Sequence, residues 1–230
     1  MVPNRKILLP VLLWTLLCAG VFAGALLQQQ TGIEWVPGLS LSNVFGWVGS
    51  ALFLYLLVLW PVSLQGMVER FARQQLRQGS FFALGLLEPV LLVLYGLPVL
   101  IAAASFGDKG AGAILQALLL FGALVLATLA HFHLGFYFHG NMAKPYFLLM
   151  GGLCVWIPLV DLVFRTLYGS GPAFLNRLNP FFAVFSLASQ GGATTWTWLT
   201  PVLVFGGLGL SALAFPILTA MPLRVYEDHS

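Results

Sequence analysis

Three histidines stand close together near the end of one apolar run, at His131, His133 and His139. Histidine is the commonest transition-metal ligand, and ionisable groups at membrane depth are candidates for function. On a helix, however, His131 and His133 point about 200° apart, and His139 lies about 12 Å along the axis from His131. The spacing therefore favours structural histidines. A His-based metal or haem site, in a membrane enzyme or redox subunit, is the alternative.

An acidic and a basic residue form a second candidate in a later apolar run. Asp161 and Arg165 are four residues apart, so on a helix they face each other across one turn. This spacing predicts an ion pair that lowers the cost of burying both groups. The functional alternative is a polar gate or a substrate contact. Pro158, one turn before Asp161, predicts a kink in the same helix.

The most polar part of the chain runs from residue 66 to residue 80. Its charges favour a helix because Glu69 and Arg73 have the stabilising i, i+4 order, and a glycine follows where a helix would end. We predict a short amphipathic cytoplasmic helix here. It serves either as a docking site for a cytoplasmic partner or as a solvated connection that fixes the orientation of the chain. The candidate partner-binding residues are Glu69, Arg70, Arg73, Arg77 and Gly79.

The composition defines the elements that must position these residues. Of 230 residues, 60% are hydrophobic and 7% are charged, whereas about 25% of an ordinary soluble domain is charged. The mean hydropathy is +0.94, and a soluble core of this length could not hide so much apolar surface. A soluble enzyme, a disordered chain and a nucleic-acid-binding domain are therefore excluded. We expect an all-α polytopic membrane protein, with residues 1–230 forming a single transmembrane domain.

Six apolar runs are long enough to cross a bilayer as helices. The first could be a signal peptide, but its length favours a first span. Residues 168–197 are apolar for a connection and are expected to be re-entrant or interfacial before the last span. Glu88 and Pro89 are expected to start the third helix, because an acid and a proline suit a first turn. The expected spans are 7–27, 44–64, 84–105, 111–138, 146–167 and 198–220.

The basic residues predict the orientation of the chain. With the N-terminus inside, seven of the ten Lys and Arg residues fall in cytoplasmic segments and three in outer ones. Because cytoplasmic segments carry the excess of Lys and Arg, we predict that both termini are cytoplasmic. The two cysteines, Cys18 and Cys154, fall inside apolar runs and are expected to be core residues rather than a disulfide.

The order of these features resembles the membrane (permease) subunit of an ABC-2 type ABC transporter. Such subunits have six helices with both ends inside, and a short coupling helix in the loop between helices two and three. That loop often contains Glu-Arg, then a Gly-Thr pair, then a Pro leading into helix three. Here the matching positions are Glu69-Arg70, Gly79-Ser80 and Pro89. The chain departs from the family in having Ser80 for Thr and only residues 1–6 before its first span.

The external segment extends the resemblance to the last third of the chain. The family tends to have an apolar re-entrant segment before the last helix, often with Asn-Pro, which corresponds here to Asn179-Pro180 within residues 178–186. Asn179 and Pro180 therefore join Asp161 and Arg165 as candidate pathway or gate residues. The resemblance implies a permease that forms its translocation path as a dimer and is moved by a partner at its inner face.

The resemblance also implies where the chemistry takes place. The chain has no G-x-x-x-x-G-K-[ST] phosphate loop, so ATP and Mg²⁺ are expected on a separate cytoplasmic ATP-binding subunit. This chain is expected to be no enzyme and to hold no cofactor, metal or catalytic residue. The expected partners are that subunit, a second permease subunit and the lipid bilayer of a bacterial inner membrane, without nucleic acid. A structural subunit of a larger membrane complex is a further alternative.

Overall fold

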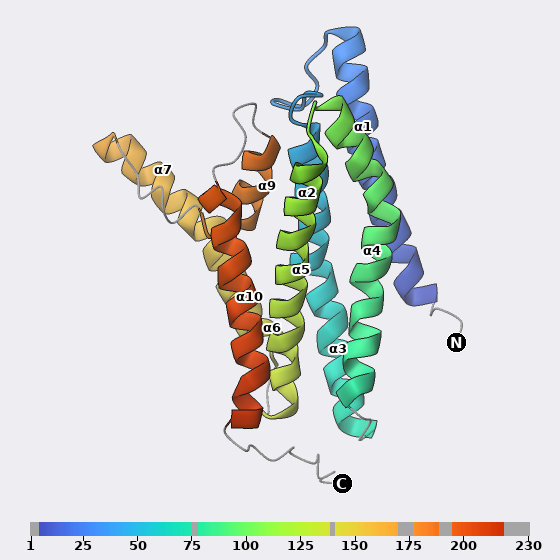
Figure 1. The fold of residues 1–230 in the computed structure, drawn as a ribbon, viewed down its shortest axis with the longest axis vertical. Coiled ribbons are helices and arrows are strands. Elements are labelled where there is room, and N and C mark those ends of the chain that lie inside the picture. Colours follow the sequence, from blue (N-terminus) through green and yellow to red (C-terminus); the bar gives the residue numbers. More distant parts are fainter. Residues whose placement is uncertain (1–4, 75–77, 139–140, 170–176, 189–194, 219–230) are drawn as a thin grey trace.

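The computed structural model describes residues 5–74, 78–138, 141–169, 177–188 and 195–218. All regular structure in these residues is helical (Figure 1). Two five-residue segments are π-helical turns, η1 (Tyr55–Leu59) and η3 (Gly152–Trp156), and η2 (Leu134–Phe136) is a 3₁₀ turn. The α-helices are α1 (Arg5–Thr31), α2 (Val44–Leu54), α3 (Trp60–Gln74), α4 (Gln78–Phe106), α5 (Ala111–His133), α6 (Ala143–Gly151), α7 (Ile157–Tyr168), α9 (Pro180–Ala188) and α10 (Thr195–Leu218).

Within the described residues, six helical stretches are long and apolar enough to cross a membrane, which agrees with the predicted number and order of candidate spans. The second is one continuous helix of α2, η1 and α3, and the fifth combines α6, η3 and α7. In Figure 1, α1 begins and α10 ends toward the same end of the bundle. Which side of a membrane that end faces stays a prediction. The spans are Leu8–Thr31, Val44–Arg70, Ser80–Phe106, Ala111–Phe136, Ala143–Tyr168 and Trp196–Leu218.

Spans two and four form the centre of the bundle. Half of the apolar window of each is buried, compared with 11% for span five. Span four, in α5, packs against α10, while α4 packs against α1 and α2. Between spans two and four, the rings of Phe53 and Phe121 meet edge to face with centroids 5.8 Å apart. Because lipid tails are as apolar as these side chains, burial here reports contact between helices rather than hydrophobicity alone.

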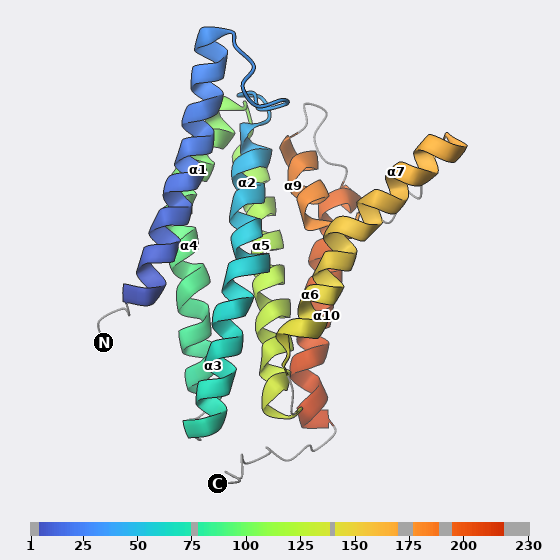
Figure 2. The ribbon, with the colours of Figure 1, turned by 180° about the vertical axis from the view of Figure 1, so that it is seen from behind.

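Span five leaves the bundle partway along its length. Tyr146 and Met150 of α6 are buried, whereas Asp161 is the buried residue of α7. Figure 2 shows α7 turning away from the other helices. The change of direction follows η3 and Pro158 at the start of α7, and π-turns and prolines are the usual causes of such bends.

The apolar segment before the last span forms the short helix α9. With nine residues, it is about 13 Å long and too short to cross a bilayer. α9 packs against α2, α5 and α10. Two glycines of α2 admit it: a Cβ on Gly49 would lie 2.5 Å from Val184 Cγ1, and one on Gly46 would lie 2.7 Å from Phe185 Cδ1. Small residues thus let two backbones approach closely, as is common between membrane helices.

Two helices extend beyond the expected limits of their spans. α4 begins at Gln78, so Glu88 and Pro89 lie inside it, and the prediction that they start the third helix is wrong. A membrane helix tolerates an internal proline because neighbouring groups can satisfy the freed backbone carbonyl. α3 continues without a break from span two to Gln74. The polar segment therefore prolongs spans two and three wherever it is described, and its separate amphipathic helix stays a prediction.

Candidate functional site

The predicted partner-binding residues lie where α3 ends and α4 begins. Glu69 and Arg70 are exposed on the last turns of α3. Glu69 Oε1 accepts a hydrogen bond from Gln65 Nε2 at 2.9 Å. Arg73 also belongs to α3 and Gly79 to the first turn of α4, while Arg77 lies outside the described residues. The end of α3 and the start of α4 thus lie together at one end of the bundle (Figure 2), and we refer to these two helix ends as the tip.

The candidate gate residues gather around a surface hollow between α7 and α9. Asp161 and Arg165 come from α7, and Asn179 immediately precedes α9. Pro180, the fourth candidate, is buried at the first position of α9. The structure therefore brings together residues that the sequence singled out in two separate segments. The hollow is lined by Pro158, Asp161, Leu162, Arg165, Asn179 and Phe182.

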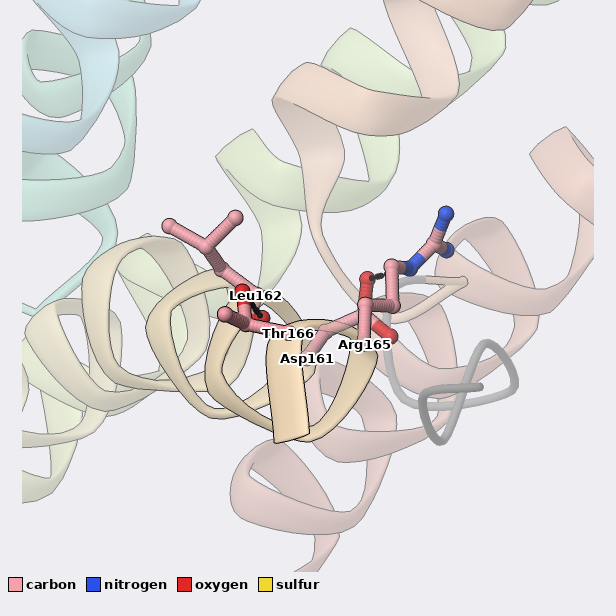
Figure 3. Close-up of polar contacts among 4 residues, drawn as sticks. All are labelled: Asp161, Leu162, Arg165 and Thr166. Carbon is pink, nitrogen blue, oxygen red and sulfur yellow. Dashed lines mark hydrogen bonds and ion pairs between the residues drawn. The ribbon is translucent and has the colours of Figure 1, made fainter. Parts of the chain in front are cut away.

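Each polar group that lines this hollow bonds to a group in its own helix or in the helix that follows it directly. Arg165 Nε donates to Asp161 Oδ2 at 2.8 Å (Figure 3), as the i, i+4 spacing predicts. Asn179 Oδ1 accepts from the Phe181 backbone N–H at 2.9 Å, which caps the start of α9. The side chain of Asp161 is 8% exposed and that of Arg165 is 54% exposed. The pair thus presents a guanidinium at the rim of the hollow with a carboxylate behind it, and its role as a gate stays a prediction.

The histidines occupy separate positions. The His131 Nε2–H donates to the Met142 carbonyl at 2.9 Å, which assigns the proton to that nitrogen. His133 is buried, and its ring centroid lies 4.9 Å from that of Phe82. His139 lies outside the described residues. Among the residues that the structure describes, no three His, Cys, Asp or Glu side chains gather as metal ligands.

A buried carboxyl lies inside the bundle, at Glu88 of α4. Glu88 is 2% exposed, and Tyr55 Oη of η1 donates to its Oε1 at 2.6 Å. Ser63 of α3 lies beside the carboxyl, but Oε2 makes no hydrogen bond in the described part of the chain. No Lys, Arg or His forms an ion pair with Glu88 within the described residues. The carboxyl is therefore held by hydroxyl groups.

The wide turn η1 creates this contact. The Trp60 backbone N–H bonds to the Tyr55 carbonyl, five residues back. In an α-helix these two side chains would point about 140° apart, whereas the wider turn lets both reach α4. Trp60 Nε1 donates to the Gly85 carbonyl at 3.2 Å, one turn before Glu88. That carbonyl is available because its ordinary partner in the helix would be residue 89, a proline without an N–H.

Trp14 of α1 completes the arrangement around Tyr55. Its ring meets the Tyr55 ring edge to face, with centroids 5.7 Å apart, and its Nε1 donates to the Ala51 carbonyl at 2.6 Å. Gly85 permits the close approach on the other side, since a Cβ there would lie 2.7 Å from Leu129 Cδ2 of α5. Spans one to four therefore all contribute to the surroundings of the buried carboxyl.

The sequence pattern gives only a partial sign of this site. Glu88 falls inside the expected span 84–105, where an acidic residue needs a partner or a role. That position was the available signal, but the following proline favoured a helix start. Tyr55 and Trp60 belong to another helix, and an α-helical period places them on different faces. No spacing rule could pair them with Glu88.

Comparison of the chain with protein-family models, with curated proteins and with solved structures finds no match. The resemblance to ABC-2 permeases therefore depends on the residues of this chain alone. It rests on the Glu-Arg and Gly-Ser positions between spans two and three and on Asn179-Pro180 before the last span. The function that follows from it is a proposal.

Proposed function

We propose that this chain is the permease subunit of an ATP-driven, ABC-2-type transporter. It works as a dimer in a bacterial inner membrane and is coupled to a separate ATP-binding subunit. The chain contributes the translocation path and no catalytic residue. This proposal brings together the number of spans, the polar tip between α3 and α4, and the short helix before the last span.

The observation that carries the proposal is the half-buried helix α9. A helix of nine residues, too short to span, occupies the place where these permeases have a re-entrant segment. It begins at Asn179-Pro180, the dipeptide on which the resemblance rests, and Gly46 and Gly49 of span two admit it. α9 is therefore packed into the bundle as one of its helices. In a permease it lines or closes one end of the path.

The tip of α3 supports the coupling role. Glu69 and Arg70 are exposed there, so their charges are available to a partner. This end of the bundle is also where α1 begins and α10 ends in Figure 1. A force applied to the tip acts along spans two and three, because α3 and α4 are continuous with them. An ATP-binding subunit that closes against this tip would reorient both spans.

Co-purification tests the proposal. The tagged chain is purified from native membranes, and mass spectrometry identifies proteins that carry a G-x-x-x-x-G-K-[ST] loop. We expect one cytoplasmic ATPase to co-purify with the wild-type chain and to be lost from the Glu69→Lys/Arg70→Glu double variant. The control is Glu34→Lys, which repeats the Glu69→Lys substitution in the connection between α1 and α2 at the opposite end of the bundle. This variant is expected to keep the ATPase.

Two outcomes contradict the proposal. The first is the absence of any such ATPase from the wild-type preparation. The second is a stable complex that survives replacement of residues 69–78 by a Gly/Ser linker, since coupling then cannot depend on this tip. Circular dichroism and gel filtration of each variant show that the bundle itself is intact.

A further inference from the structure

An ionised Glu88 side chain would be buried without enough neighbouring groups to compensate its charge. An ionised carboxylate removed from water is costly unless cations or several hydrogen bonds compensate it. Glu88 is 2% exposed, and one hydrogen bond, from Tyr55 at 2.6 Å, reaches its Oε1. Its Oε2 is buried without a hydrogen bond in the described part of the chain. The neutral hydroxyl groups of Tyr55 and Ser63 beside the carboxyl offset only part of the cost of a full charge.

Among the side chains that the structure describes, the elements packed against α4 supply no cation that pairs with Glu88. Residues 8–31 of α1 and all of α2 contain no Asp, Glu, Lys, Arg or His. Glu69 and Arg70 of α3 are exposed at the far tip of that helix. His131 and His133 of α5 contact Met142 and Phe82 respectively. The remaining titratable groups of the packed elements are Tyr55 of η1, Cys18 of α1, Tyr95 of α4 itself, and three cations at helix ends, Arg5 and Lys6 at the start of α1 and Arg73 near the end of α3.

We propose that Glu88 is a proton-binding site in the interior of the bundle, occupied while α4 is closed against η1. The proton sits on Oε2, since Oε1 accepts the hydrogen bond from Tyr55. Ser63, which lies beside the carboxyl and is exposed on the outer side of α3, gives the proton a polar neighbour. On release, the Oε2–H bond breaks, its electron pair stays on the carboxylate, and the proton passes to water.

The ligand is a proton rather than a metal ion because too few oxygens converge. Hard cations take about six oxygen ligands. The side chains around this position offer the carboxyl of Glu88 and the hydroxyls of Tyr55 and Ser63. No group of three His, Cys, Asp or Glu residues is found within the described residues. A proton needs one lone pair, and binding it removes the charge that burial penalises.

The same contacts couple the proton to the position of α4. The closed state joins η1 to α4 through Tyr55–Glu88 and Trp60–Gly85. Release leaves an anion that must be solvated, so water has to enter between η1 and α4. Proton release and opening of this contact are therefore linked. The inference concerns this chain alone and does not depend on the proposed ATP-binding partner.

Infrared spectroscopy of the purified full chain in lipid tests the site directly. We expect a carbonyl stretching band of a protonated carboxylic acid at neutral pH, where exposed carboxyls are ionised, and we expect it to shift in D₂O. The band should be absent from Glu88→Gln, a neutral variant of the same shape. Asp161→Asn is the matched control and should keep the band, because Asp161 is ion-paired with Arg165.

Two further variants keep the test decisive if Glu88→Gln does not fold. Tyr55→Phe removes the donor to Oε1 and should raise the frequency of the band, as expected for a carbonyl that loses a hydrogen bond. Trp60→Phe removes the donor to the Gly85 carbonyl and should speed the D₂O shift, because the contact opens more often. The absence of a neutral-pH band that any of these variants alters would overturn the proposal. So would a band that sodium, but not choline, abolishes, since the ligand would then be a metal cation.

Discussion

Two carboxyl groups are buried within spans of this bundle, and the structure compensates them in different ways. Glu88 of α4 is 2% exposed and Asp161 of α7 is 6% exposed. Asp161 has an arginine one turn away on its own helix, at 2.8 Å. Glu88 receives a hydrogen bond from a tyrosine of another span, at 2.6 Å. The Asp161–Arg165 pair is local and lies within one helix. The Tyr55–Glu88 hydrogen bond exists only when spans two and three are packed together.

The two sites share their backbone features. Each is associated with a π-turn and a proline: η1 and Pro89 at the Glu88 site, and η3 and Pro158 at the Asp161 site. At η1 the wide turn faces a neighbouring helix, and Tyr55, Leu56 and Leu57 are buried. At η3 the helix turns away from the bundle, and Trp156 is 63% exposed. The comparison shows that a π-turn can either join two helices or separate one helix from the rest.

The largest expected effect is at Trp60, which directly follows η1, and its comparison is Trp156, the last residue of η3. Trp60→Ala leaves a cavity and strands the Gly85 carbonyl, so we expect a loss of about 3–5 kcal/mol in the free energy of unfolding. Trp156→Ala, at an exposed position, should change it by less than about 0.5 kcal/mol. Denaturant titration in detergent micelles measures both. Equal losses of unfolding free energy would mean that the two tryptophans stabilise the bundle equally, which would contradict the difference proposed between η1 and η3.

The hydrogen bond between Tyr55 and Glu88 should give the next largest effect. Tyr55→Phe leaves a buried acceptor unsatisfied and should cost about 1–3 kcal/mol of unfolding free energy. In the Tyr55→Phe/Glu88→Leu double variant both partners are apolar, so its loss should be smaller than the sum of the two single losses. A double-mutant cycle on unfolding free energies measures this difference. Strict additivity of the two substitutions would contradict a direct interaction.

The contact between α9 and span two connects the Glu88 region with the Asp161 region. This contact should be sensitive to a single added methyl group. Gly49→Ala places a Cβ against Val184, and overpacking of this kind costs about 1–3 kcal/mol. Gly206→Ala in α10 is the control, since a Cβ there meets nothing within 4 Å. That variant should be neutral or stabilising by about 0.5–1 kcal/mol, because glycine is unfavourable inside a helix. Thermal unfolding followed by tryptophan fluorescence ranks the pair.

The smallest effect is expected at the Asp161–Arg165 pair. Half of the Arg165 side chain is exposed, so Arg165→Gln should lower the unfolding free energy by only about 0.2–1 kcal/mol. The loss should shrink further at high salt, because screening weakens accessible ion pairs. Unfolding at two salt concentrations measures it. A loss of unfolding free energy above about 3 kcal/mol would be typical of a buried ion pair. The difference between this pair and the Glu88 site would then disappear.

Much of the architecture could be predicted from the sequence, and the reasons are local. An apolar run long enough to cross a bilayer must form a helix, because a backbone in lipid has to satisfy its own hydrogen bonds. The same reasoning predicted that residues 168–197 include an apolar segment that does not span, and α9 (Pro180–Ala188) lies there. The Asp161–Arg165 pair also followed from spacing, since i, i+4 neighbours on one helix meet wherever that helix lies.

The Glu88 site could not be predicted in this way because its parts lie on different spans. A glutamate followed by a proline suits a first turn, and only the extension of α4 back to Gln78 shows that the pair lies inside a helix. The π-turn η1 is equally hidden, since Tyr55 and Trp60 sit in an apolar run with no glycine or proline between them. The hydrogen bonds from Tyr55 and Trp60 to α4 stabilise the wide turn.

The sequence by itself determined that this chain is helical, that six of its segments can span a membrane, and that its charges concentrate outside those segments. These properties depend on residues near one another in the chain and on the solvent around them. The tertiary structure decided which carboxyl is shielded by a neighbouring span, which glycines receive α9, and which part of span five leaves the bundle. Those outcomes depend on the groups that meet when helices pack, and a periodic pattern along one helix carries no record of its neighbours.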